Sequence, residues 1–431
     1  MIAPAQTWDI LVLAFAQSFT QPSFELFAKL ISGWIICPGR HTVTHIIRVI
    51  DGEGKHAHDA YHRFLRVGVW SMAVLWKTVA QMIVSVLRLT EALDLDLDDT
   101  LFHKSGRKVN GAAIFRDAVR SSGKTVVYAL GLNLVILTLR LKPPWGGEPL
   151  GLPINLRLYI KDGPSRLQLG KEMITEVAGW LPNHRFTLSC DGAYASLAGR
   201  GLPRTQVVSR MRSDAALYEL PPKRKKGQRG RPRKKGKRLP TPTEIACRRK
   251  KGWVQTTVEK RGKTVESLIY VLPVLWYAVC PNQEVLLVIV RDPDGKQNDD
   301  FFFTTDLTAF GAQVAGQYAG RWSIEDTNRN VKQFLGGEDP QSWKDKGPER
   351  AAALACWIYS LVWFWYLTNY GTKRSWISLP WYPAKCKPSF TDARAALRRV
   401  LWQQRVIPMC DDRPHPLKII DTLIEALALA A

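Results

Sequence analysis

The spacing of apolar and polar residues changes along this 431-residue chain. In residues 7–90 apolar side chains recur at helical spacing, with polar breaks at Cys37–Thr42 and Asp51–His58. From residue 92 the spacing becomes that of strands, and Leu93–Asp98 alternates strictly between apolar and acidic side chains. Residues 371–431 return to helical spacing. The pattern therefore predicts an α/β region flanked by helical regions at both ends.

The middle of the chain predicts a sheet in which helices separate some of the strands. The strands expected first are Leu93–Asp98, Thr125–Leu141, Leu152–Ile160, Arg185–Cys190 and Thr205–Met211. Helices are expected at Ser165–Leu181, Tyr194–Ala198 and, later, Leu307–Gly336. Three strands, a helix, a strand and a helix is the order expected of an RNase H-like α/β core.

A basic segment interrupts this core. Lys223–Lys251 holds 15 Lys and Arg against one acidic residue, and its prolines and glycines predict a flexible polycation without regular structure. The stretch Gly230–Gly236 contains Arg231 and Arg233 and is similar to the Gly-Arg-Pro core of AT-hook arms that bind the minor groove. A nonspecific solvated linker is the alternative. After it, three runs predict the strands of a β-rich insertion: Trp253–Glu259, Val265–Cys280 and Gln283–Val290.

The amino-acid composition limits the kinds of molecule that this protein is expected to bind. The formal net charge is +23 and the isoelectric point is near 9.8, which favours a polyanion such as DNA, ribosomal RNA or a membrane surface. The seven cysteines are scattered without a Cys-x-x-Cys pair, which argues against a zinc knuckle or a disulfide framework. The beginning of the chain lacks the features of a signal peptide, so a cytoplasmic protein is expected.

One apolar run has two interpretations. Ala351–Thr368 is apolar for 18 residues, which is at the short end of a membrane span. It is an isolated run between polar flanks, and it closely follows the most chemically suggestive helix. A helix buried inside the protein is therefore the favoured interpretation.

The most informative motif lies in the helix expected at Leu307–Gly336. Tyr318, Arg321, Glu325 and Lys332 stand at positions i, i+3, i+7 and i+14. At about 100° per residue they form one stripe on one face of one helix. A phenol, a guanidinium, a carboxylate and an ammonium do not form a core stripe, but they suit a metal ion together with several phosphates.

This spacing resembles the Y-(2)-R-(3)-E-(6)-K signature of a large group of bacterial insertion-sequence transposases of the DDE type. Asp98 with Thr100 resembles the D-x-T of that group, and Asp191 resembles its second aspartate. The resemblance implies that Asp98, Asp191 and Glu325 are the catalytic residues and the metal ligands. Three carboxylates without His or Cys suit Mg²⁺ or Mn²⁺, with two ions per active site.

Several assignments keep an alternative. Asp99 competes with Asp98, which is preferred for the D-x-T match and for its strand parity with Asp96. Asp94 and Asp96 form a face with Asp98 that could simply be solvated. An aspartate at the end of a strand, such as Asp191, also serves as a turn former or helix cap.

The expected DNA contacts extend beyond the catalytic carboxylates. Those implied by the signature are Tyr318, Arg321 and Lys332, and those expected from charge are Lys104, Arg107, Arg231 and Arg233. For Lys104 and Arg107 a solvated hairpin is the alternative. Thr42–Ile50, which follows Arg40 and His41, is expected to be a recognition helix or an ordinary packed helix.

Tryptophans form a further group of candidates. In hairpin-forming relatives a tryptophan of the insertion stacks on a flipped base. Trp253 and Trp276 are candidates for that role, with core packing as the alternative. Trp322, inside the signature, is expected to face the core.

The sequence thus predicts a DNA-end-binding region at 1–90, a catalytic domain at 91–370 with a basic loop and β-insertion at 213–305, and an assembly region at 371–431. The predicted activity is metal-dependent cleavage and strand transfer at terminal inverted repeats, by a homodimer associated with the bacterial nucleoid. The alternatives are a repair or junction nuclease and an inactive, domesticated DNA-binding relative. The apolar stripe of Leu417–Leu429 packs either on its own subunit or on a partner.

Overall fold

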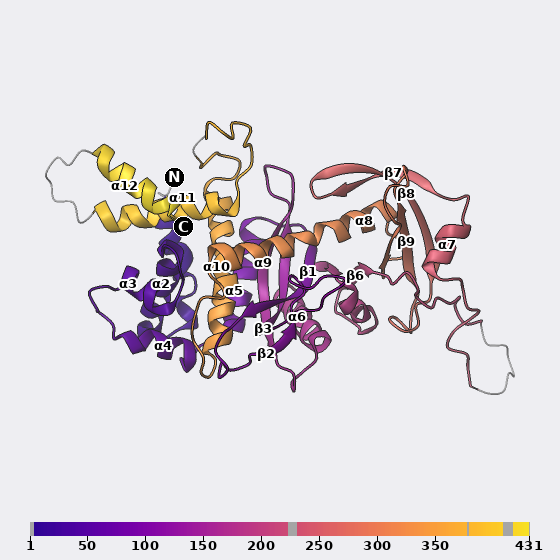
Figure 1. Cartoon of the computed structure of the whole chain (residues 1–431), viewed down its shortest axis with the longest axis horizontal. Coiled ribbons are helices and arrows are strands. Elements are labelled where there is room, and N and C mark those ends of the chain that lie inside the picture. Colours follow the sequence, from indigo (N-terminus) through magenta and orange to yellow (C-terminus); the bar gives the residue numbers. More distant parts are fainter. Residues whose placement is uncertain (1–3, 223–230, 377–378, 408–416, 431) are drawn as a thin grey trace.

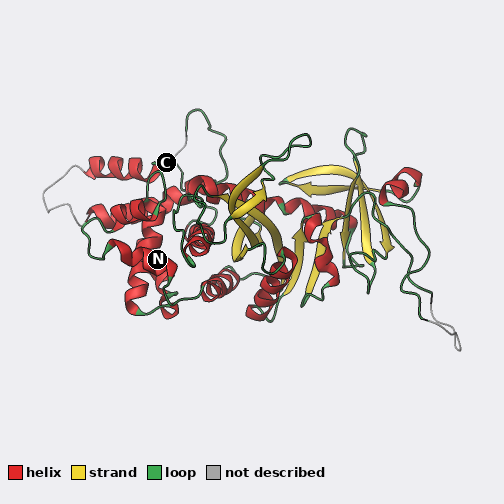
Figure 2. Cartoon of the chain, turned by 60° about the horizontal axis from the view of Figure 1, so that its bottom comes forward, coloured by secondary structure: helices red, strands yellow, loops and turns green. Residues whose placement is uncertain are grey.

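The computed structural model describes residues 4–222, 231–376, 379–407 and 417–430. The molecule is elongated, with a helical body at one end, a central sheet, and a second group of strands at the other end (Figures 1 and 2). Helices from the beginning and from the end of the chain lie side by side in the helical body. The chain is therefore a mixed α/β structure flanked by helices, as the hydrophobic pattern predicts.

The central sheet contains five strands that overlap the predicted ones, although the first continues to His103, so Asp98 lies inside it and not at its end as predicted. They are β1 (Ala92–His103), β3 (Tyr128–Leu141), β4 (Leu150–Tyr159), β5 (Arg185–Cys190) and β6 (Thr205–Arg210). Their spatial order is β4-β3-β1-β5-β6, in which β1 pairs antiparallel with β3 and parallel with β5. The fold is compatible with an RNase H-like core.

The insertion continues this sheet. Its strands are β7 (Val254–Lys260), β8 (Lys263–Val274), β9 (Val285–Arg291) and β10 (Asp300–Thr304). β10 pairs with β6 of the core, so a single ten-stranded sheet runs from β2 (Ala113–Arg116) to β7. β2 and β10 are absent from the sequence prediction, because strands of four or five residues give a weak periodic signal.

The basic segment is more ordered than predicted. Residues 223–230 lie outside the described residues, but α7 (Pro242–Arg248) is a helix, and Tyr218 bridges to Arg238. The expectation of no regular structure through Lys251 is therefore wrong. Pro242 occupies a first-turn position that needs no hydrogen-bonded N–H, and Thr241 and Glu244 form a capping box.

Helices cover the two faces of β1 differently. On one face, Leu97 packs at Gly170 of α6 (Arg166–Trp180), where no larger side chain fits without displacement. On the other face lie α8 (Gly311–Gly320) and α9 (Trp322–Phe334). Asp96 points to this second face and is fully buried, bonded to Arg140 and Ser323. The acidic face of β1 is therefore covered rather than solvated.

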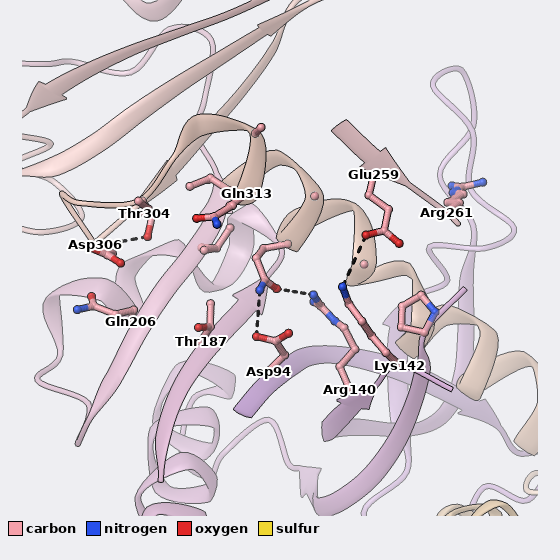
Figure 3. Close-up of a pocket in the computed structure, with 18 of the residues that line it drawn as sticks. Asp94, Arg140, Lys142, Thr187, Gln206, Glu259, Arg261, Thr304, Asp306 and Gln313 are labelled. Atoms are coloured by element: carbon pink, nitrogen blue, oxygen red, sulfur yellow. Dashed lines mark hydrogen bonds and ion pairs between the residues drawn. The ribbon is translucent and has the colours of Figure 1, made fainter. Parts of the chain in front are cut away.

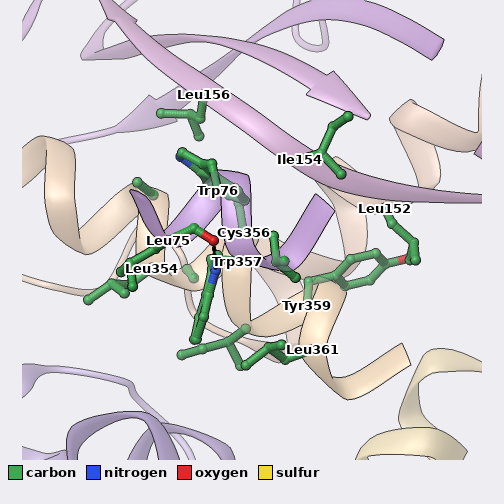
Figure 4. Packing of buried hydrophobic residues seen from close by; sticks show 14 of the residues in the cluster. Leu75, Trp76, Leu152, Ile154, Leu156, Leu354, Cys356, Trp357, Tyr359 and Leu361 are labelled. Carbon is green, nitrogen blue, oxygen red and sulfur yellow. Dashed lines mark hydrogen bonds between the residues drawn. The ribbon is translucent and has the colours of Figure 1, made fainter. Parts of the chain in front are cut away.

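The apolar run at 351–368 forms part of α10 (Gly347–Asn369), which is long and apolar enough to cross a membrane. In this structure, however, 89% of its most apolar window is buried inside the protein. Trp357 Nε1 donates to the carbonyl of Leu75 at 3.3 Å, and Ser360 Oγ donates to that of Pro153 at 2.7 Å. Figure 4 shows α10 packed against α5 (Met72–Val86) and the central sheet. It is a core helix, consistent with a protein that does not span a membrane.

The helical body combines both ends of the chain. Its remaining helices are α1 (Pro4–Leu13), η1 (Ala16–Ser18), α2 (Gln21–Ile36), α3 (Val43–Ile50), α4 (His58–Arg66), α11 (Phe390–Val406) and α12 (Leu417–Leu429). Arg398 of α11 is buried and donates to the carbonyls of Ile35 and Cys37 at 2.6 Å each, which fastens α11 to the end of α2. Of the α12 stripe, Ile424 is buried, whereas Ile419 is 65% exposed.

The predicted recognition helix corresponds to α3. Its residues Val43, Ile46 and Ile47 are buried, so this face packs on the helical body. Its exposed face carries Thr44 and Arg48. α3 therefore packs as an ordinary helix of the body, and only a small polar face of it is directed to solvent.

Asp51, at the end of α3, joins three segments of the helical body. Its carboxylate accepts hydrogen bonds from Lys29 of α2 at 3.1 Å, from Tyr61 of α4 at 3.0 Å and from the backbone of His56 at 3.1 Å. Burial alone would raise the pKa of Asp51, but these bonds outweigh it and lower the pKa from 3.8 to about 2. The charged carboxylate therefore stabilises the folded body.

We expect Asp51→Asn to lower the free energy of unfolding by about 2 kcal/mol at neutral pH. Because the folded-state pKa is depressed, the stabilisation is present above about pH 4 and is lost as the pH falls toward about 2. Denaturant unfolding at several pH values measures the difference between the two proteins. Glu53→Gln, at an exposed position in the same turn, is the control, and an Asp51→Asn variant as stable as wild type would contradict the assignment.

Candidate active site

The candidate site begins at Asp98 on β1. Its side chain points to the face covered by α9, and its Oδ2 lies 2.7 Å from Nη1 of Arg321. Asp99 points to the opposite face, where its carboxylate accepts from Arg166 at 2.8 Å and from Tyr194 at 3.0 Å. Strand alternation therefore separates the two competing aspartates, and only Asp98 faces the signature helix.

The signature spans two helices rather than the single predicted helix. α8 ends and α9 begins at Arg321, although the backbone there keeps helical angles (φ −53°, ψ −26°). The two helices run end to end across the sheet (Figure 1). Glu325 lies one turn after Arg321, and its Oε1 is 2.8 Å from Nη2 of Arg321. One guanidinium thus joins the carboxylates of Asp98 and Glu325.

Asp191 directly follows β5, which pairs in parallel with β1. It is exposed and caps η2 (Gly192–Gly199), where its Oδ1 accepts the N–H of Gly192 at 2.6 Å. It is also near enough to Asp98 for its charge to raise the pKa of Asp98. Asp191 is therefore both a helix cap and part of the acidic cluster.

The electrostatics of Asp98 are unusual. Burial raises its pKa from 3.8 to about 7; the nearby charge of Arg321 opposes this rise, whereas those of Asp99 and Asp191 add to it. Folding therefore places a carboxylate where its charged form is disfavoured. Such an arrangement is typical of functional sites.

The three carboxylates provide oxygen donors suited to a divalent cation. Within the described residues, no group of three or more His, Cys, Asp or Glu side chains forms a ready-made metal site. Arg321 lies between Asp98 and Glu325 and supplies positive charge there. The donor set nevertheless fits a hard cation, because Asp98, Asp191 and Glu325 all offer carboxylate oxygens.

The other two signature residues flank this cluster. Tyr318 packs against Phe302 with ring centroids 4.7 Å apart, and burial raises its pKa. Lys332 donates to the carbonyl of Leu101 on β1 at 2.7 Å, and burial lowers its pKa. The signature thus extends along β1 from the level of Asp98 to that of Leu101.

The remaining predicted cations lie in different surroundings. Lys104 is partly buried and donates to the carbonyls of Glu338 and Pro340 at 2.7 and 3.1 Å, and burial lowers its pKa to about 8. Its ammonium therefore holds a loop together. Arg107, Arg231 and Arg233 are exposed.

The tryptophan predictions have different outcomes. Trp276 is buried against Phe303, as core packing requires, whereas Trp253 is only partly buried and lies between Tyr270 and the guanidinium of Arg291. The expectation that Trp322 faces the core is wrong: it is 40% exposed, and the guanidinium of Arg261 lies 3.8 Å from its ring centroid. One residue after Arg321 the helix has turned by about 100°, away from both the carboxylates and the core.

Two residues of the site, Asn328 and Gln317, are absent from the sequence prediction. Asn328 lies three residues after Glu325, on the same face of α9, and its Oδ1 is buried without a hydrogen-bond partner among the described residues. Its helical spacing was the signal that could have revealed it. One turn before Arg321, Gln317 donates to Asp94 at 3.1 Å and accepts from Arg140 at 2.8 Å, which holds α8 on the sheet. Figure 3 shows Asp94 and Arg140 side by side in the pocket at this place.

With this geometry established, comparison with known families defines the class. An α/β sheet with carboxylates on two adjacent parallel strands, here Asp98 within β1 and Asp191 directly after β5, is an arrangement suited to metal-assisted cleavage of phosphodiesters. The family model described as DDE superfamily endonuclease matches residues 14–267, more than half of the chain, so the chain belongs to this family. The match includes Asp98 and Asp191 and ends before Glu325. Members typically use divalent metals, and the family implies a DNA substrate. No curated protein matches the chain.

We expect Asp98→Asn to stabilise the metal-free protein in a pH-dependent way. Because the folded-state pKa is raised, the contribution of Asp98 to stability is present below about pH 4 and is lost as the pH rises through about 7. Wild type should therefore lose up to about 2 kcal/mol relative to the variant between pH 5 and pH 8. Thermal unfolding in the presence of a chelator measures this, and a pH-independent difference would contradict the raised pKa.

Proposed function

We propose that this protein is a DDE transposase that cuts and rejoins DNA at the terminal inverted repeats of a mobile element. In this proposal the five central strands form an RNase H-like core, and Asp98, Asp191 and Glu325 are the catalytic carboxylates. The observation that carries the proposal is the pairing of Asp98 and Glu325 through Arg321, beside Asp191 at the end of the neighbouring strand.

The three carboxylates would hold Mg²⁺ or Mn²⁺, in two ions per site, which when bound activate the attacking oxygen and stabilise the leaving oxygen. The protein's own residues would position the DNA. Arg321 would exchange its two carboxylate partners for phosphate oxygens, to which a guanidinium can bind in two-pronged fashion. Lys332 would hold the next part of the strand, and Tyr318 would donate a hydrogen bond from its phenol.

The chemistry would proceed by two displacements at phosphorus. In the first, water attacks the phosphodiester at the element end, the bond to the 3′ oxygen breaks, and a free 3′ hydroxyl and a 5′ phosphate result. In the second, that hydroxyl attacks another phosphodiester and releases a new 3′ hydroxyl, so the number of bonds is conserved. Attack on the opposite strand gives a hairpin, and attack on target DNA gives integration.

Two other functions fit the same family. A repair or junction nuclease would cut without preference for terminal repeats and without strand transfer. An inactive, domesticated relative would bind DNA without cutting it. The signature spacing of Tyr318, Arg321, Glu325 and Lys332 favours the transposase over the first, and the complete carboxylate set favours it over the second.

Transposition requires two element ends in one complex, so we propose a homodimer acting in the bacterial nucleoid. The exposed part of α12, which includes Ile419 and Leu423, is a surface available to such an assembly. DNA that bridges two subunits is the alternative means of joining them.

We expect Glu325→Gln to reduce Mg²⁺-dependent cleavage at least about a hundredfold, because loss of a metal ligand removes several kcal/mol of transition-state stabilisation. DNA binding should change little, since it depends on other groups. A gel-shift assay beside a cleavage assay measures both. Asp326→Asn is the matched control, because Asp326 pairs with Arg329 instead of Arg321. Retained cleavage in the Glu325→Gln variant would require another third ligand.

The exposed part of the basic segment should contribute affinity without sequence information. Replacing Arg231, Arg233 and Lys234 by Gln should flatten the slope of log K against log salt by up to about 0.9 per lost phosphate contact. The preference for terminal-repeat DNA over random DNA should remain. Replacing both arginines by Lys keeps the charge and provides the control, since loss of preference in that protein would favour an AT-hook.

A further inference from the structure

A cavity of about 760 Å³ lies beyond Lys332, outside the carboxylate cluster. One wall is the loop after β1, which contains Lys104, Arg107 and Lys108. The other is the loop after α9, which runs from Glu338 to Trp343, and Arg40 of the helical body completes the rim. The cavity is thus built by three parts of the chain that the fold brings together.

The acidic groups of this cavity are already engaged. Oε1 of Glu338 accepts the N–H of His103 at 2.8 Å and lies 2.9 Å from its Nδ1. Oδ2 of Asp339 accepts the N–H of His41 at 2.8 Å. By contrast, Arg107 and Lys108 are exposed and have no hydrogen-bond or ion-pair partner in the described part of the chain. The cavity therefore offers positive charge that nothing within the described residues uses.

The ring of Trp343 in this cavity suits a nucleotide base. It is 47% exposed, and the ammonium of Lys344 lies 4.5 Å from its centroid. An exposed aromatic ring beside unpaired cations is the combination with which proteins bind single-stranded nucleic acid.

The cavity is preorganised. The backbone N–H of Asn110 donates to the carbonyl of Trp343 at 2.8 Å, and its side chain donates to the carbonyl of Asp345 at 2.8 Å. Lys104 joins the same two loops through the carbonyls of Glu338 and Pro340. Binding there would require little ordering of the protein, which reduces the entropic cost of association.

The distance from the cavity to the carboxylates can be estimated along β1. His103 at its edge is five residues beyond Asp98 on β1, which at ~3.3 Å per residue is about 16 Å. A DNA strand rises ~3.4 Å per nucleotide, so this distance corresponds to about five nucleotides. Lys332 lies between the two places, at the level of Leu101. A strand cut at the carboxylates would pass Lys332 and then reach the cavity.

We propose that this cavity is a binding subsite for unpaired DNA, in which a base stacks on Trp343 while Arg107 and Lys108 bind the phosphates. The subsite holds the strand about five nucleotides from the cut and requires that the duplex be opened there. The proposal rests on the DNA-cleaving function proposed above.

The test uses the full-length protein with Ca²⁺ in place of Mg²⁺ and compares two DNA probes. One is a fully paired duplex, and the other has the same sequence with a short unpaired stretch that contains iodouracil. Trp343→Ala should weaken binding to the unpaired probe about 5- to 100-fold and leave duplex binding nearly unchanged. Trp343→Phe should keep most of the affinity, because a phenyl ring also stacks.

Trp381→Ala is the matched control, since Trp381 is 80% exposed on another loop, and it should change neither affinity. Replacing Arg107 and Lys108 by Gln should weaken both probes, more strongly at low salt. Illumination should cross-link the iodouracil to Trp343. Equal loss for both probes in the Trp343→Ala variant, no loss for either, or cross-linking only to another tryptophan would overturn the proposal.

The outcome is separable from that of the proposed function, because neither binding nor cross-linking requires cleavage. Specific cross-linking by a protein that never cuts DNA would support the subsite and refute the transposase. Cleavage and strand transfer without any contribution from Trp343 would refute only the subsite.

Discussion

The structure depends on how the acidic face of β1 is covered. Asp94, Asp96 and Asp98 alternate along one strand and point toward the same two helices. Buried carboxylates are costly unless paired, and here each has a partner supplied by another element. Gln317 donates a hydrogen bond to Asp94. Asp96 and Asp98 each form an ion pair with an arginine, Arg140 and Arg321 respectively. This set of contacts fixes α8 and the start of α9 on the sheet and so positions Glu325.

The ion pairs of Asp96 and Asp98 differ in how far they are buried. Asp96 and Arg140 are both almost completely buried, and their pairing holds strands β1 and β3 to α9. Asp98 and Arg321 remain partly accessible, with side chains 21% and 11% exposed. The proposed function requires Arg321 to exchange its partners for a phosphate, whereas Arg140 cannot leave Asp96 without exposing a buried carboxylate. The face thus combines a buried ion pair with a more accessible one, two residues apart on the strand.

Support for α9 comes from far along the chain. Trp34 of α2 donates to the carbonyl of Leu335 at 2.7 Å, and Arg394 of α11 donates to that of Phe334. α10 contacts the first helices, the sheet and α11, and so it joins the helical body to the central sheet. The two ends of the chain thus secure the last turn of the helix that carries Glu325. Substitutions in the helical body are therefore expected to influence the site through the position of α9.

Much of this protein follows from its sequence. The alternation of Leu93–Asp98 determined a strand with one acidic face, and helical spacing placed Arg321, Glu325 and Lys332 on one side. Periodicity is a local property, however, and it does not state which neighbour covers a face. Only the tertiary structure decided that Asp98 meets Arg321 while Asp99 meets Arg166, that Trp322 is exposed beside Arg261, and that β10 joins the insertion to the core sheet. The physical reason is that these outcomes depend on contacts between residues far apart in sequence, whose energies no local pattern records.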